Sequence, residues 1–248
     1  MDLGITGKVA LVTGASRGLG FAAAQALRAE GCRVAICGRD PQRLAAAAAE
    51  LDAVAIVADM SITGDPARAV HETAEALGSV DILVANAGGP APGGFLAVEE
   101  ADWERALQQN LMGTVRLVRA AVPAMCERGW GRVITITSRT VREAIDGLVL
   151  SNATRPGVAG VVRTLAREVA GTGVTINNVL PGSFATERLL ELYGTEDAVA
   201  ARGASSPMGR IGDPGELGAV VAFLAGVQAS YVTGTSILVD GGESHVIA

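Results

Sequence analysis

The chain alternates between short apolar runs and longer segments in which apolar residues recur at helical spacing. Short continuous apolar runs are typical of strands buried on both faces, and a period of about 3.6 residues is typical of amphipathic helices. The predicted strands are residues 9–12, 33–37, 54–58, 82–84, 132–137, 174–179 and 236–239. The predicted helices begin near residues 18, 41, 65, 99, 152 and 214, and the fourth extends to about residue 128.

This order of strands and helices predicts an α/β fold: a doubly wound, seven-stranded parallel sheet flanked by helices. No linker or shift in composition divides the chain, so residues 1–248 are expected to form a single domain. In such a sheet, ligands bind beyond the carboxyl ends of the strands, where the strand order reverses. The polar residues that follow each strand are therefore the first candidates for a site.

A glycine-rich turn joins the first predicted strand to the first predicted helix at residues 13–20. Unpaired N–H groups and the positive end of the helix dipole meet at such a turn, which suits a pyrophosphate. Gly14 can adopt the positive φ of a tight turn, Gly18 allows a ligand to approach the backbone, and Gly20 allows the helix to lie close to the strand.

The same turn also fits a second motif. Residues 14–18 match G-x-S-x-G, the nucleophile elbow of α/β-hydrolases, which likewise lies between a strand and a helix. A serine hydrolase with Ser16 as nucleophile and Asp240 and His245 as partners is therefore a competing interpretation.

Composition and charge exclude several classes of function. The formal net charge is −6 and no cluster of Lys or Arg is present, which argues against nucleic acid or an anionic membrane as partner. No apolar run is long enough to span a bilayer and the first residues lack a signal-peptide pattern, so we expect a cytoplasmic protein. The cysteines and histidines lack the spacing of a zinc site, so no metal is expected.

Several motifs, in their order and spacing, resemble the short-chain dehydrogenase/reductase family, and in particular 3-oxoacyl-[acyl-carrier-protein] reductases. These are the TGxxxGxG form of residues 13–20, the NAG of residues 86–88, the PGxxxT of residues 181–186 and the turn at residues 239–242. The resemblance covers the whole chain and implies a Rossmann-fold oxidoreductase domain. The cofactor-binding residues that it implies are Gly14, Ser16, Arg17, Gly18, Leu19, Gly20, Arg39, Asp59, Met60, Asn86, Ala87, Gly88, Arg155, Pro181, Gly182, Phe184 and Thr186.

Charge at the end of the second strand bears on the choice of cofactor. An acidic residue there binds the ribose hydroxyls of NAD and repels a 2′-phosphate. This chain has Arg39 at that point and Arg17 nearby, and two guanidinium groups can pair with a phosphate. NADP(H) is therefore favoured over NAD(H). Asp40 keeps NAD(H) open, and Arg39 would equally fit a solvent-exposed start of the following helix.

The resemblance implies Asn110 and Ser138 as catalytic residues, but the family's tyrosine and lysine are missing. Aligned on the following helix, Ser151 stands at the tyrosine position and Arg155 at the lysine position. An alkyl hydroxyl starts at a much higher pKa than a phenol, and arginine stays charged, so the usual proton transfer is lost. Arg155 can still bind ribose hydroxyls and supply a positive field.

Three interpretations follow from this departure. The favoured one is an enzyme that interconverts a carbonyl and a secondary alcohol, taking its proton from ordered water. Candidate residues for this proton path are Asn110, Ser138 and Ser151 around the water, or Glu143, Asp146 and Tyr193 as replacement acids. The second is a catalytically weak NADP(H)-binding pseudoenzyme or sensor. The third is a site retuned for a charged substrate, held by Arg139, Arg142 or Arg155; a solvated loop is the plainer explanation of the first two.

Pro156 affects where the next helix begins. A proline deep inside a helix removes a backbone donor, so we expect the regular helix to start at about Asn152, with Ser151 free to act as its cap. By resemblance, the helices at residues 99–128 and 152–170 pair between subunits in a homotetramer. The segment at about residues 183–206 is expected to form a mobile substrate lid. Its leucines suggest a hydrophobic or acyl substrate, although a lid packing on its own core would show the same pattern.

Overall fold

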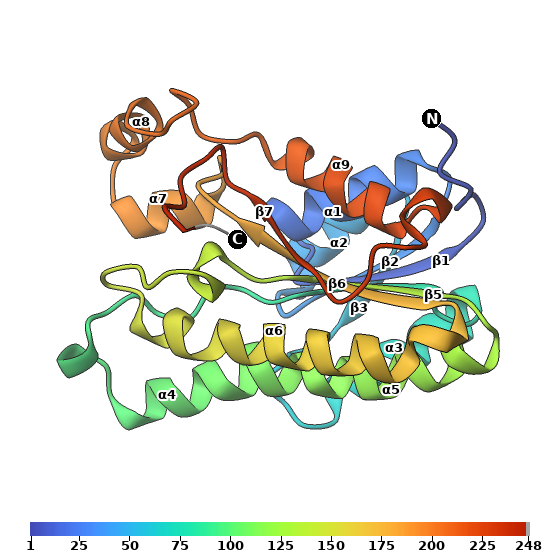
Figure 1. Cartoon of the computed structure of the whole chain (residues 1–248). Helices are drawn as coiled ribbons and strands as arrows, with labels where there is room; N and C mark the ends of the chain where they lie inside the picture. The colour runs from blue at the N-terminus through green and yellow to red at the C-terminus, as the bar shows by residue number, and fades with distance from the viewer. Residues whose placement is uncertain (247–248) are drawn as a thin grey trace.

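Seven strands form one parallel sheet in the order β3-β2-β1-β4-β5-β6-β7 (Figure 1). The computed structural model describes residues 1–246, so residues 247 and 248 of the expected domain lie outside the described part. The strands are β1 (Val9–Thr13), β2 (Arg33–Gly38), β3 (Val54–Val57), β4 (Ile82–Asn86), β5 (Gly131–Ile136), β6 (Val174–Pro181) and β7 (Ser236–Val239). The predicted doubly wound sheet is confirmed.

Helices cover both faces of this sheet. Helices α1, α2 and α9 lie on one face, and α3, α5 and α6 lie on the other, above and below the sheet in Figure 1. The helices are α1 (Gly18–Ala29), α2 (Pro41–Leu51), α3 (Asp65–Leu77), α4 (Glu100–Ala106), α5 (Gly113–Glu127), α6 (Val149–Val169), α7 (Glu187–Tyr193), α8 (Glu196–Ala204) and α9 (Pro214–Ala225). Buried Ala, Val, Leu and Ile side chains fill both layers because the strands are apolar on both sides.

The strand order reverses between β1 and β4, which are hydrogen-bonded neighbours. Side chains hold their carboxyl ends together. The Thr13 hydroxyl donates to the carbonyl of Asn86 at 2.7 Å, and the Asn86 amide donates to the carbonyl of Gly14 at 3.0 Å. The topology therefore places the glycine-rich turn beside the residues that follow β4.

The start of α6 differs from the prediction. The helix begins at Val149, so Ser151 lies inside its first turn and is not its cap. Tertiary contacts explain the earlier start, because the N–H of Val149 bonds the carbonyl of Gly93 and Leu150 is buried. Packing thus overrides the penalty of Pro156, which lies inside the helix.

Two other segments are less regular than their patterns indicate. The long helical stretch predicted from residue 99 contains a π-helical segment, Leu107–Met112, between α4 and α5. The segment at residues 183–206 holds α7 and α8, which lie together beyond the carboxyl ends of the strands, at the left of Figure 1. It therefore occupies the place expected of a lid. We refer to residues 183–206 as the lid, and its motion stays a prediction.

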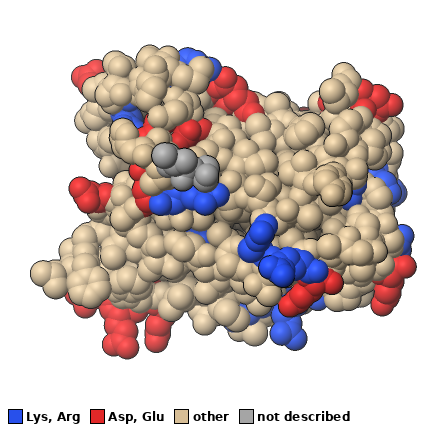
Figure 2. Space-filling view, in the orientation of Figure 1, with Lys and Arg blue, Asp and Glu red and all other residues tan. Residues whose placement is uncertain are grey.

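The surface carries charges of both signs. On the face drawn in Figure 2, basic and acidic side chains occur in small mixed groups among uncharged residues. Within residues 1–246, no helix is both long and apolar enough to cross a membrane.

Candidate active site

The glycine-rich turn has the geometry of a phosphate cradle. Gly14 and Gly18 have φ of +58° and +61°, in the left-handed region that favours glycine. A Cβ on Gly20 would lie 2.3 Å from the carbonyl oxygen of Gly14, so only glycine allows α1 to approach β1 this closely. In the described structure no side chain caps the N-terminus of α1, which leaves its first N–H groups for a ligand. The turn fits a dinucleotide diphosphate.

One cavity of about 430 Å³ runs along the carboxyl ends of the strands. We call it the cleft. It brings together most of the residues that the sequence singled out. Those lining it are Gly14, Ser16, Arg17, Gly18, Leu19, Arg39, Asp59, Met60, Asn86, Ala87, Gly88, Ser138, Ser151, Arg155, Pro181, Gly182, Phe184 and Thr186. Gly20 lies behind the turn and Asn110 lies in the core, fully buried.

Basic side chains gather at the end of the cleft formed by β2 and β3. Arg39 lies 3.9 Å from the carboxylate of Asp59 across this end. Asp40 is engaged elsewhere, because its carboxylate accepts the N–H groups of Gln42 and Arg43 and so caps α2. Arg43, in the first turn of α2, pairs with Glu187 of α7.

Helix α7 is joined to the glycine-rich turn by ion pairs. The guanidinium of Arg17 contacts the carboxylates of Glu187 and Glu191. Glu191 also accepts from Arg188 of its own helix at 3.4 Å. Because Glu187, Arg188 and Glu191 all line the cleft, α7 closes over it directly.

The loop after β4 is held by side chains from several elements. Arg155 donates to the carbonyl of Ala87 at 3.2 Å, Gln109 to that of Gly88 at 3.1 Å, and Arg188 to that of Pro90 at 2.6 Å. A Cβ on Gly89 would lie 2.9 Å from Nε of Arg188, so this guanidinium lies flat on the glycine backbone. We call residues 86–90 the β4 loop.

Ser138 and Ser151 both face the cleft and are linked through Thr140. The Ser138 hydroxyl oxygen accepts the N–H of Thr140 at 3.1 Å, and the hydroxyls of Thr140 and Ser151 lie 3.1 Å apart. Asn152 fixes the loop above them, because its amide bonds both the N–H and the carbonyl of Ile145. The loop from β5 to α6 is thus tied to the first turn of α6.

Arg155 is a buried cation. Its guanidinium donates to the carbonyls of Ile136 and Ala87, while its Nε has no hydrogen-bond partner among the described residues. Burial, and then the nearby charge of Arg188, lower its pKa from 12.5 to about 10. The side chain therefore remains charged at neutral pH and brings a positive field to the cleft.

Asn110 lies in the π-helical segment, a type of distortion that is frequent at functional sites. Its Nδ2 donates to the carbonyl of Ala106, and its buried Oδ1 has no partner in the described part of the chain. The π turn also brings Gln109 into the cleft. Asn110 thus lies behind the cleft wall and does not line the cleft.

The residues considered as replacement acids lie elsewhere. Glu143 pairs with Arg139, Asp146 is exposed, and Tyr193 is 41% exposed at the end of α7; none of them lines the cleft.

The residues of the alternative serine hydrolase site are not brought together. Ser16 lies against the end of β2, whereas Asp240 follows β7, the far edge strand of the sheet.

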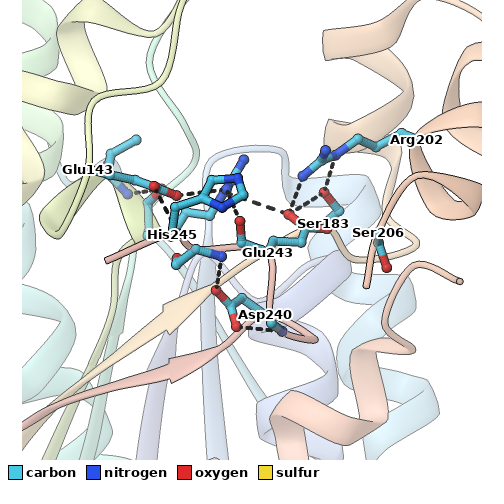
Figure 3. A network of polar contacts seen from close by, with 12 residues as sticks. Glu143, Ser183, Arg202, Ser206, Asp240, Glu243 and His245 are labelled. Atoms are coloured by element: carbon cyan, nitrogen blue, oxygen red, sulfur yellow. Dashed lines mark hydrogen bonds and ion pairs between the residues drawn. The ribbon is translucent and has the colours of Figure 1, made fainter. Parts of the chain in front are cut away.

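A network of polar contacts lies beside the cleft and links the lid to the loop after β5 (Figure 3). The Glu243 side chain is 3% exposed and accepts from Arg202 of α8 and from Ser183. Arg139 points at the same carboxylate from the other side and also pairs with Glu143. Asp240 accepts the backbone N–H groups of Gly242 and Ser244, and the N–H of His245 donates to Glu143.

Comparison with known proteins identifies the family. A family model described as "Enoyl-(Acyl carrier protein) reductase" matches residues 14–244. The chain belongs to the short-chain dehydrogenase/reductase family. One relative in this family, the 3-oxoacyl-[acyl-carrier-protein] reductase of Escherichia coli, is 37% identical over 239 residues, which is 95% of this chain and 97% of that protein.

Solved structures of short-chain dehydrogenases/reductases share the whole fold. A putative gluconate dehydrogenase from Agrobacterium tumefaciens superposes with a TM-score of 0.92 and 33% identity, covering 100% of both chains. The L-sorbose reductase of Gluconobacter frateurii, solved with NADPH and L-sorbose, has a TM-score of 0.92 and 28% identity, again over 100% of both chains. The chain is thus an oxidoreductase by family.

The structure adds lining residues that the motifs did not indicate, chiefly Gln109, Glu187 and Arg188. Glu187 and Arg188 follow the PGxxxT motif directly. No sequence signal pointed to Gln109, because the pattern of an ordinary α-helix does not indicate that a π turn will rotate this residue toward the cleft.

Proposed function

We propose that this protein is an NADP(H)-dependent oxidoreductase that interconverts a carbonyl and a secondary alcohol. The single observation that carries the proposal is the cleft, in which the glycine-rich turn, Ser138 and Arg155 line one cavity. When bound, the nicotinamide supplies or accepts the hydride at the reacting carbon. The chain's own residues hold the dinucleotide, orient the carbonyl and provide a route for the proton.

The preference for NADP(H) rests on charge. Arg39 follows the end of β2, where the ribose of a dinucleotide binds in this fold, and Arg43 lies in the first turn of α2. Arg17 of the glycine-rich turn is near them, because it shares the carboxylate of Glu187 with Arg43. Asp40, the residue that would favour NAD(H), is engaged as the cap of α2. Arginine pairs bidentately with phosphate, so these side chains favour a 2′-phosphate.

Ser138 and Arg155 have distinct roles in the proposed reaction. The Ser138 oxygen accepts a backbone N–H, so its own proton is free to donate to a substrate carbonyl. Arg155 keeps its charge and stabilises negative charge that develops on the carbonyl oxygen. Because none of the replacement acids considered above, Glu143, Asp146 and Tyr193, lines the cleft, water held by Ser138 and Ser151 delivers the proton.

A substrate panel tests this function. Purified protein is mixed with NADPH and with 3-oxo esters or diketones, and the loss of absorbance of the reduced nicotinamide is followed. Turnover with at least one carbonyl class is expected, and Ser138→Ala should lower kcat by about 100-fold or more because it removes a donor to the developing oxyanion. Turnover unchanged in Ser138→Ala would contradict the assigned role.

A non-catalytic NADP(H)-binding protein is the second candidate, favoured by the absence of Glu143, Asp146 and Tyr193 from the cleft lining. Calorimetry separates the two candidates. NADPH binding with no turnover on any carbonyl or alcohol would select the binding protein, and no affinity for NADPH or NADH would contradict both.

A homotetramer and a cytoplasmic location are the remaining parts of the proposal. All four residues of the edge strand β7 are partly exposed, and Tyr231 beside it is fully exposed, which supports an interface there. Light scattering coupled to gel filtration measures the assembly. Cell fractionation measures the location.

A further inference from the structure

The charges around the β4 loop do not balance. Arg155 takes part in no ion pair of the described chain, although its residue is only 5% exposed. Its hydrogen-bond partners are two neutral carbonyls, and its Nε has none. A buried cation without a counter-ion is costly, so an anionic partner would recover part of that cost.

A second guanidinium is bonded to the same short loop. Arg155 bonds the carbonyl of Ala87 and Arg188 bonds that of Pro90, three positions along the β4 loop, which separates the two carbonyls by at most about 11 Å. The proximity is reflected in the pKa of Arg155, which the charge of Arg188 lowers. Both side chains line the cleft.

The available carboxylate does not neutralise this pair. Glu191 lies 3.4 Å from Arg188, but it also lies 3.2 Å from Arg17 and is half exposed. One shared, exposed carboxylate therefore faces Arg188 and Arg17, and none faces Arg155. The diphosphate of the proposed cofactor belongs at the glycine-rich turn, so it leaves the charge at the β4 loop for another ligand.

We infer that Arg155 and Arg188 form an anion subsite and that the substrate is an oxo acid or hydroxy acid whose carboxylate binds between them. The inference rests on the proposed function and narrows its substrate class. Two guanidinium groups in a partly enclosed cleft suit a carboxylate, because charge-assisted hydrogen bonds are stronger there than in water. Arg188 would set specificity, and Arg155 would act on both the carboxylate and the reacting carbonyl.

Matched substrates provide the test. Short 2-oxo and 3-oxo acids are compared with their methyl esters, with NADPH as reductant. The acid is expected to have the higher kcat/KM. Arg188→Gln should raise KM for the acid by about 10-fold or more and leave KM for the ester within about 2-fold, because only the acid loses a charge-assisted bond. Arg188→Lys should retain part of the preference.

Arg33→Gln is the matched control, because Arg33 is exposed at the start of β2, at the opposite end of the sheet from the cleft, and does not line it. It should leave both substrates unaffected. Binding is measured separately, by calorimetry of acid and ester titrated into the enzyme saturated with NADP⁺, where reduction cannot occur. The acid should bind at least about 10-fold more tightly than the ester.

The outcomes separate the inference from the function on which it rests. Equal treatment of acid and ester by the wild-type enzyme would overturn the anion subsite and leave the oxidoreductase intact. Tight binding of the acid without turnover of any carbonyl would support the subsite and contradict the proposed function. A loss of NADPH affinity in Arg188→Gln, with acid and ester affected equally, would assign Arg188 to the cofactor and overturn the subsite.

Discussion

The guanidinium of Arg17 contacts the carboxylate of Glu187, which joins the glycine-rich turn to helix α7 of the lid. Arg43 shares the same carboxylate. In the proposed enzyme, both arginines also serve the cofactor phosphate, so Glu187 competes with the ligand. We therefore predict that Glu187→Gln tightens NADPH binding by up to about 5-fold, the range expected for exposed ion pairs, and changes NADH binding less.

Calorimetry at low and moderate ionic strength measures this effect, which should shrink as salt screens the pairs. Glu72→Gln is the control, because Glu72 pairs with Arg68 on the surface of α3. Weaker binding of NADPH in Glu187→Gln would mean that the ion pair holds Arg17 in place for the phosphate.

Arg39 should decide between the two nicotinamide cofactors. Its contact with Asp59 is long, at 3.9 Å, and its side chain is 65% exposed, so it is free to turn to a 2′-phosphate. Arg39→Gln is expected to raise KM for NADPH by about 10-fold and to leave KM for NADH unchanged, because only NADPH loses a charge-assisted bond. Steady-state kinetics with both cofactors measure this. A fall in NADH use of the same size would contradict the assignment.

The Glu243 carboxylate should stabilise the lid. In Glu243→Gln, an amide N–H group would face the guanidinium groups of Arg202 and Arg139. Hydrogen-bond donors would then lie against each other without an acceptor between them. We expect a loss of about 1–3 kcal/mol in the free energy of unfolding and a larger rise in KM for substrate than for cofactor. Urea unfolding and kinetics measure the two effects. Glu75→Gln, which removes an exposed contact with His71, should change neither.

The family's usual residues can be restored at the atypical positions. Ser151 and Arg155 both line the cleft, so the variant Ser151→Tyr with Arg155→Lys places a phenol and an amine there. Reduction of a generic ketone is expected to rise by about 100-fold or more, because general acid catalysis typically contributes this much. NADPH affinity, measured by calorimetry, shows whether the cofactor site survives. Loss of activity with intact binding would mean that the present Ser and Arg pair has a chemical role of its own.

We predict that the two buried cysteines make the free energy of unfolding fall at alkaline pH. Burial raises the pKa of Cys32 and Cys37 from 9.0 to about 12. A raised pKa stabilises the fold fully below pH 9, where the unfolded thiols are also protonated, and this contribution is lost as the pH rises toward 12. Urea unfolding between pH 8 and about pH 11 should show a falling free energy of unfolding. Cys37→Ala should have a shallower slope, and an unchanged slope would contradict the shift.

The regular parts of the fold followed from local pattern alone. The starts of α3 and α9 and both bounds of β7 match the predicted segments, because proline and apolar patterning mark them. The early start of α6 did not follow, because the bond between Val149 and Gly93 is a tertiary contact with no local signal. Helix propensity was outweighed there by packing.

In the candidate site, too, features with a local sequence signal were predictable and tertiary contacts were not. Most residues carried by contiguous motifs line the cleft, with Gly20 behind the turn as an exception, since each motif sits at a strand end. Their binding roles stay predictions. Pairings between distant residues were not predictable, because nothing in the chain links Arg139 to Glu243 or Arg17 to Glu187 before the strands are in order. The roles of Ser151 and Arg155 in catalysis stay predictions.

The β4 loop is bonded by side chains of α6, α7 and the π-helical segment, and by Asn86 it is bonded to the glycine-rich turn. Occupation of either half of the cleft must therefore displace or stiffen the same short stretch of backbone. The amide resonances of Gly88 and Gly89 would therefore report the binding of both ligands in nuclear magnetic resonance titrations. Adding the two ligands in either order would show which of them binds first.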